Sequence, residues 1–173
     1  MTIKNIFPPR EHVLAEDFAN FENFFPVATI EFIDNGQTVP IHIIYTFFQG
    51  SNADEGYFLD EEYGGSFSLD VVDGYCLPTF QAEALKINED YQEFLDEAKT
   101  KYKSATKRYR FAPVEFAKEP EWWQGDDTPV DEQGRSLKFI CQVDLVDIVD
   151  DDCRLYVFYD SKNKRIKNVY QRD

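Results

Sequence analysis

The turn sequence Asp34-Asn35-Gly36-Gln37 places the strongest constraint on the fold, because it separates two segments rich in β-branched and aromatic residues. An Asn-Gly pair favours a two-residue type I′ turn, in which both central residues take positive φ. We therefore predict an antiparallel hairpin with arms at 27–33 and 38–48. Pro40 has no backbone N–H to donate, so the second arm is expected at a sheet edge or a bulge.

Further strands are indicated by β-branched or aromatic runs that are bounded by turn residues. They are predicted at 67–72, 137–145, 154–160 and 165–171. The turn Asp73-Gly74 closes the first of them, and residues 161–164 join the last two into another hairpin. The stretches 49–66 and 111–136 are rich in Gly, Pro and acidic residues without periodicity, which predicts a long surface loop and an irregular connection.

Two stretches have apolar residues at spacings of three or four, the pattern of an amphipathic helix. The first ends before Pro26 and predicts a short helix at about 10–24. The second follows Thr79, a suitable N-cap, and predicts a long helix at about 79–109. Because the strands are hairpin-linked and no βαβ alternation is present, we predict an α+β fold with a mainly antiparallel sheet. A length of 173 residues predicts a single domain over 1–173.

The net negative charge of the chain disfavours negatively charged binding partners. There are 18 basic and 33 acidic residues, which give a net charge of −15 and disfavour binding to nucleic acid or to anionic membranes. Between Glu11 and Ala98 the sequence has 19 acidic residues and one basic residue, Lys86, and a basic run follows at 99–110. One interpretation is that the acids at 83–97 and the bases at 99–110 complement the dipole of the long helix. The other is that the acidic stretch forms a docking face for a basic protein partner.

The cysteines and the N-terminal residues indicate in which cellular compartment the protein is expected. The first residues lack an apolar run of roughly 7–15 residues behind a basic head, so export is not expected. No window approaches about 18 uninterrupted apolar residues, so a membrane span is not expected either. Cys76, Cys141 and Cys153 are an odd set without CxxC spacing, which argues against a disulfide framework. We therefore expect a cytoplasmic protein.

Sequence motifs for catalysis are missing. The chain contains no G-x-S-x-G, no P-loop and no G-x-G-x-x-G. His12 and His42 with three cysteines are too few to predict a zinc site, and His42 is interpreted as structural because no orienting carboxylate is recognisable. We assign no catalytic residue, no cofactor and no metal ligand.

Acidic clusters leave one alternative open. Asp60-Glu61-Glu62, Asp126-Asp127 and Asp150-Asp151-Asp152 offer hard oxygen ligands for calcium or magnesium, or carboxylates for hydrolysis. None of them matches the EF-hand loop, and solvated loop tips are the simpler explanation. A carboxylate-based hydrolase or a divalent-cation-binding protein therefore stays as an alternative.

The C-terminal third contains the most distinctive residues. A Pro-x-Trp segment at 120–122 precedes a D-x-T-P turn at 126–129, a strand that reads F-x-x-Q-x-D at 139–144, and a closing L-x-x-F strand at 155–158. In this order and spacing, residues 118–171 resemble the YwqG-like family of bacterial proteins of unknown function. The resemblance implies an α+β cytosolic protein with no established activity, catalytic residue or cofactor. Some relatives look like components of toxin and immunity systems, in which immunity proteins are often small, acidic and cytosolic.

Two pairs of residues within this third have structural and functional interpretations. Adjacent residues of an extended segment point to opposite sides, so one of Trp122 and Trp123 can enter the core while the other stays near solvent as a partner contact; alternatively, both only anchor the loop. Gln142 and Asp144 share a strand face. If that face is covered, their polar groups need partners, and the backbone of the Trp loop would provide them.

These observations lead to a hypothesis of an acidic, non-enzymatic protein that binds a basic protein partner, plausibly as an immunity-type neutraliser. A structural, self-associating subunit is a further alternative. The candidate partner-binding residues are Asp60, Glu61, Glu62, Trp122, Trp123, Asp126 and Asp127.

Overall fold

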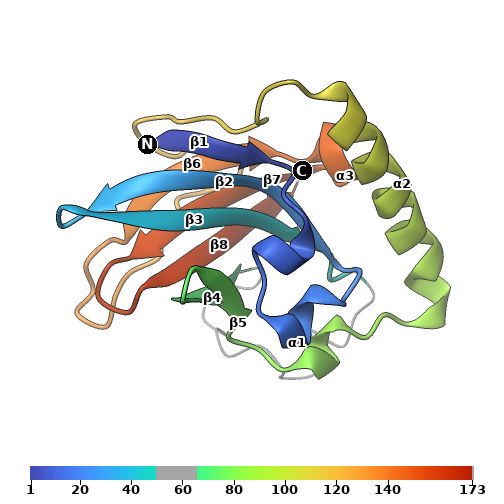
Figure 1. Cartoon of the computed structure of the whole chain (residues 1–173), viewed down its shortest axis with the longest axis horizontal. Coiled ribbons are helices and arrows are strands. Elements are labelled where there is room, and N and C mark those ends of the chain that lie inside the picture. Colours follow the sequence, from blue (N-terminus) through green and yellow to red (C-terminus); the bar gives the residue numbers. More distant parts are fainter. Residues whose placement is uncertain (50–65, 173) are drawn as a thin grey trace.

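The computed structural model describes residues 1–49 and 66–172, and its strands form two facing antiparallel sheets (Figure 1). The first sheet has the order β1-β2-β3 and consists of β1 (Thr2–Ile6), β2 (Phe24–Asp34) and β3 (Gln37–Thr46). The second has the order β5-β4-β8-β7-β6 and consists of β4 (Ser66–Val72), β5 (Tyr75–Pro78), β6 (Lys138–Asp144), β7 (Cys153–Asp160) and β8 (Arg165–Arg172). The fold is α+β, as the sequence predicts.

Helices are gathered at one end of the sheets. They are α1 (Glu16–Ala19), α2 (Gln92–Arg108) and α3 (Val146–Val149), with 3-10 turns η1 (Arg10–His12), η3 (Ala82–Leu85) and η4 (Glu89–Tyr91). In Figure 1, α2 runs along the right edge of the molecule, whereas the tip of the β2–β3 hairpin lies at the left. None of the described helices combines the length and apolar character needed to cross a membrane.

Local turn chemistry accounts for the hairpins. Asn35 and Gly36 have φ of 49° and 80°, and Asp34 pairs with Gln37 across them, so the predicted two-residue turn is confirmed. Pro40 lies in β3, which is an edge strand, also as predicted. The predicted strands in the C-terminal third are confirmed as β6, β7 and β8 to within two residues at each end.

The apolar core lies between the two sheets. Rings from opposite sheets meet there: the centroid of Phe32 is 5.8 Å from that of Tyr159, and Tyr45 is 5.8 Å from Tyr170. A smaller cluster on the outer face of the second sheet contains Tyr156, Phe158 and Val169, and it is covered by Trp122, Leu137 and Phe139. The segment 111–136 contains no helix and no strand longer than a single bridge, which confirms the predicted irregular connection. Its residue Trp122 packs on this outer face.

The predicted N-terminal helix at 10–24 is wrong. Residues 10–12 and 16–19 form only short turns of helix, and β2 begins at Phe24. The reason is a long-range contact: Cys76 of β5 donates its N–H to the Val13 carbonyl at 2.7 Å and accepts from the Ala15 N–H at 2.9 Å. The chain at 13–15 thus extends the edge of the second sheet and cannot continue a helix.

The predicted long helix at 79–109 is confirmed only over 92–108. Thr79 does not cap a helix, because its hydroxyl and its N–H both bond to the Ser68 carbonyl. Asn23 donates to the Leu85 carbonyl at 3.0 Å, and Asn88 accepts from the Asp90 N–H at 3.2 Å. These bonds hold 79–91 as separate turns before α2.

One face of α2 packs onto the end of the first sheet. Leu95, Ala98 and Ala105 are buried on this face. Tyr102 shares it: its hydroxyl donates to the Pro26 carbonyl at 2.6 Å, and its ring contacts Phe25 at a centroid distance of 5.2 Å. Since these positions recur every three or four residues, the rotation of α2 about its own axis is fixed.

We expect Tyr102→Phe to lower the free energy of unfolding by about 1–2 kcal/mol, because the carbonyl of the buried Pro26 loses this donor. The measurement is equilibrium urea unfolding. Tyr91→Phe is the matched control: it removes a hydroxyl from an exposed ring and should change stability by less than about 0.5 kcal/mol. Equal effects of the two substitutions would contradict this description of how α2 is anchored.

Candidate protein-binding surface

The two tryptophans both hold the segment 118–129, here called the Trp segment, against the second sheet. The Trp122 ring lies 4.3 Å from the Tyr156 ring and stacks at 6.0 Å on Phe158. The Trp123 ring lies under the guanidinium of Arg154 at 4.9 Å. Both side chains are half-buried, so the anchoring interpretation describes their geometry.

Two buried glutamines bond the backbone of the Trp segment. Gln142 on β6 accepts from the Glu121 N–H at 2.9 Å and donates to the carboxylates of Glu115 and Glu121 at 2.9 and 3.1 Å. Gln171 on β8 accepts from the N–H groups of Trp123 and Gln124 at 2.9 and 3.0 Å. The expected role of Gln142 is confirmed. That of Gln171 was not foreseen.

Asp144 does not share this role. Its carboxylate accepts from the Val146 N–H at 3.2 Å and lies 3.9 Å from Arg154, so it contacts the start of α3 instead of the Trp segment. The expectation for Asp144 is therefore wrong. The physical reason is the tight turn from β6 into α3, which brings a local backbone donor within reach of the side chain.

Asp126 and Asp127 also have structural contacts. Asp126 accepts from the N–H and the hydroxyl of Thr128 at 3.0 and 2.6 Å, and these bonds, the hydroxyl bond first, lower the pKa of its carboxyl. Asp127 accepts from the Gln171 side chain at 2.6 Å. The D-x-T-P sequence thus forms a turn that is bound to the sheet. Asp60, Glu61 and Glu62 lie outside the described residues.

In the acidic cluster at 150–152, Asp150 and Asp151 bind different partners. Asp150 pairs with Lys101 at 3.0 Å, while Asp151 accepts from the Tyr45 hydroxyl at 2.6 Å and pairs with Arg172 at 3.1 Å. Over 1–49 and 66–172, no three His, Cys, Asp or Glu side chains are grouped as metal ligands.

The three cysteine thiols and the His42 ring are buried, and burial shifts their pKa values. Burial raises the pKa of the Cys153 thiol to about 12, and it raises the pKa of the Cys76 and Cys141 thiols further. His42 donates from Nε2 to the Gly74 carbonyl at 2.7 Å and accepts at Nδ1 from the Thr29 hydroxyl at 2.9 Å. Burial lowers the pKa of His42, against a smaller raising effect of the bond to Gly74. The ring therefore links the first sheet to the β4–β5 turn.

Some carboxylates of the acidic stretch 11–98 form ion pairs, both on the strands and at the end of the molecule where the helices lie. On the strands, Glu31 pairs with Lys4 at 3.0 Å and Asp70 pairs with Arg165 at 2.6 Å. At the helical end, Lys99 binds Glu22 at 2.6 Å and Asp96 at 3.0 Å. The bond to Glu22 raises the pKa of Lys99, and the bond to Lys99 lowers that of Asp96. The stretch therefore does not form one uniform face.

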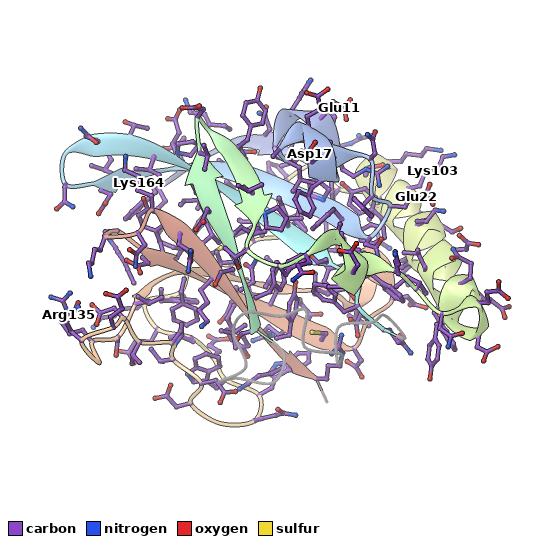
Figure 2. All side chains as sticks on the ribbon, turned by 90° about the horizontal axis from the view of Figure 1, so that it is seen from below. Glu11, Asp17, Glu22, Lys103, Arg135 and Lys164 are labelled. Carbon is purple, nitrogen blue, oxygen red and sulfur yellow. The ribbon has the colours of Figure 1, made fainter. Side chains whose placement is uncertain are left out.

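Most carboxylates at the helical end lack such a base. Among the residues that the structure describes, the following acidic side chains form no ion pair: Glu11, Glu16, Asp17, Glu83, Glu89, Asp90, Glu93 and Glu97. Figure 2 shows Glu11, Asp17 and Glu22 near α1 and α2, whereas Arg135 and Lys164 lie at the opposite end. The negative charge that is not neutralised thus gathers around α1, η4 and the first half of α2.

Two aromatic side chains lie exposed within this charge. Tyr91 is 38% and Phe94 is 45% exposed, and their ring centroids are 5.9 Å apart. Their acidic neighbours in the chain are Glu89, Asp90, Glu93 and Glu97. We call these six residues the acidic–aromatic surface.

The sequence interpretation missed this surface because Tyr91 and Phe94 keep the apolar spacing of the helix predicted at 79–109. In the structure the buried face of α2 carries Leu95 and Ala98, and Phe94 is turned outward. A signal was present: Asn88, followed by two acidic residues, is typical of the start of a helical turn.

A groove continues from this surface along α2. Its volume is about 810 Å³, and its lining residues are Glu93, Asp96, Glu97, Thr100, Lys101, Ser104 and Asp150. Four of these carry carboxylates and one, Lys101, carries a positive charge. The groove is therefore acidic, and it is wide open to solvent.

Comparisons with known proteins give no relative: no family model, no curated protein and no solved structure matches the chain.

We expect Gln171→Leu to release the Trp segment, because the N–H groups of Trp123 and Gln124 lose their acceptor. The free energy of unfolding should fall by about 2–4 kcal/mol. Both tryptophans of the chain lie in this segment, so acrylamide quenching of tryptophan fluorescence should increase. Gln133→Leu, at an exposed position, is the control. Unchanged quenching in Gln171→Leu would show that the glutamine does not hold the segment.

His42 should make stability depend on pH. Its pKa in the folded state lies below the ordinary value of 6.5, so the unfolded state binds the proton first as the pH falls. Stability is then lost as the pH drops from about 6.5 toward the folded-state pKa. We expect His42→Gln to lose less stability than the wild type in this window, measured by urea unfolding, with His12→Gln as the exposed control. A wild-type pH dependence in His42→Gln would refute this assignment.

Proposed function

We propose that this protein binds a basic protein partner through the acidic–aromatic surface, and that it acts in the bacterial cytoplasm as an immunity-type neutraliser without catalysing a reaction. One observation carries the proposal: an exposed pair of aromatic rings, Tyr91 and Phe94, lies among carboxylates that have no base beside them.

This combination has the physical properties of a binding surface. Aromatic side chains bury a large apolar area at an interface and are enriched among the residues that dominate binding energy. Carboxylates around them increase the association rate with a positively charged protein and repel acidic competitors. A net charge of −15 strengthens both effects.

The family proposal concerns the other end of the chain. We propose that residues 118–171 belong to the YwqG-like family. In support, the residues that carry the resemblance contact one another: Gln142 bonds Glu121, and Trp122 stacks on Phe158. On this view the shared residues maintain the packing of the Trp segment, which agrees with a family for which no catalytic residue is established.

The test is capture of proteins from a lysate of the source organism, identification of each captured protein, and affinity measurement with the purified partner. We expect a partner with a pI above about 9 whose binding weakens when salt rises from about 50 to 500 mM. The double substitution Tyr91→Ala and Phe94→Ala should weaken binding by at least about tenfold.

Phe111→Ala is the matched control, because Phe111 is 84% exposed but lies outside the acidic–aromatic surface. It should leave the affinity unchanged. An acidic partner, binding that is insensitive to salt, or an equal loss in Phe111→Ala would each contradict the proposal.

A further inference from the structure

The groove along α2 indicates what the partner presents, and this inference rests on the proposed function. The α2 residues that line it recur at spacings of three and four: Glu93, Asp96, Glu97, Thr100, Lys101 and Ser104. They form one stripe of the helix, about 16 Å long at 1.5 Å per residue. Phe94 lies beside the start of the stripe and Asp150 closes its far side. The groove is thus a straight continuation of the acidic–aromatic surface.

We infer that the partner places a basic amphipathic α-helix in this groove, with an apolar side chain on Tyr91 and Phe94 and an arginine on Asp150. A helix of about three turns matches the length of the stripe. Thr100, toward the middle of the stripe, and Ser104, at its end, are small, so they allow close approach of the partner helix. The carboxylates of Glu93 and Glu97 complement basic residues spaced at i and i+4 on the partner helix.

Lys101 occupies the place of the partner's cation in the free protein. Its ammonium lies 3.0 Å from the Asp150 carboxylate, and 37% and 58% of the two side chains are exposed. An ion pair with this exposure contributes little to stability, so a competing cation displaces it easily. An arginine of the partner binds Asp150 more strongly than Lys101 does, because its planar guanidinium can bind both carboxylate oxygens.

The position of Asp150 is fixed by the fold. Asp150 ends α3 in the left-handed region, with φ of 61° and ψ of 30°. The adjacent helices are joined by Arg108, which donates to the Asp147 carbonyl at 2.8 Å. The backbone at Asp150 is therefore held beside α2, where its carboxylate binds Lys101, and Lys101 selects partners whose cation replaces it.

The experiment measures the affinity of a labelled synthetic helical peptide of about 15 residues by fluorescence anisotropy. The peptide has a leucine anchor and arginines at i, i+4 and i+7, and a scrambled peptide has the same composition. Lys101→Met should tighten binding of the helical peptide about three- to fivefold, because Asp150 becomes free. Asp150→Asn should weaken binding by at least about threefold.

Lys103→Met is the matched control, since it makes the same change in net charge. Lys103 is not among the residues that line the groove. We expect this variant to change the affinity by less than about twofold. Equal effects of Lys101→Met and Lys103→Met, equal binding of the scrambled peptide, or no binding of the helical peptide would each overturn the inference.

The two proposals fail in different ways. If a basic partner binds and Phe94→Ala weakens it, but Lys101→Met and Lys103→Met act alike on the peptide, only the helix-in-groove inference fails. If substitution of the aromatic pair leaves binding of the basic partner intact, the proposed function itself fails.

Discussion

The packing of α2 onto the first sheet is the constraint on which the proposed surface depends. Leu95, Ala98 and Ala105 are buried, and Tyr102 bonds the Pro26 carbonyl from the same face. Successive residues of a helix are turned by about 100°, so burial of this stripe turns Phe94 and Glu97 outward. A rotation by one residue would bring charged side chains into the core, which makes any other orientation costly. The exposed aromatic and acidic residues therefore follow from the burial of their neighbours.

The charges of α2 bear on both interpretations of its sequence, complementarity to the helix dipole and a docking face for a basic protein. Bases of its second half bind groups near its C-terminal end: Lys101 pairs with Asp150, and Arg108 binds Asp147 of α3. Acids of its first half, Glu93 and Glu97, have no base beside them among the described residues. The bases that complement the helix dipole thus lie in the second half of α2, and the acids without a base lie in the first half.

The sequence predicted those parts of the fold that depend on local chemistry. The Asn35-Gly36 turn specifies its own hairpin, because few other residues accept positive φ at both positions. The helix limits failed where distant backbone intervened: Cys76 binds the chain at 13–15, and Asn23 binds Leu85. For the candidate site, the distinctive Trp segment was recognised and its side chains contact the second sheet, while Phe94 has the apolar spacing of the predicted helix and is exposed. Whether an apolar residue near a helix start is buried or exposed depends on the residue at which the helix begins. Sequence patterns locate that residue only to within one or two positions.

Hydrogen–deuterium exchange of the protein alone and in complex with a captured basic protein locates the binding surface. Binding at the acidic–aromatic surface should slow exchange in η4 and along α2, over residues 89–104, and leave the Trp segment unchanged. Protection confined to 118–129, or to the β2–β3 hairpin tip at the opposite end of the molecule, would show that the partner binds elsewhere.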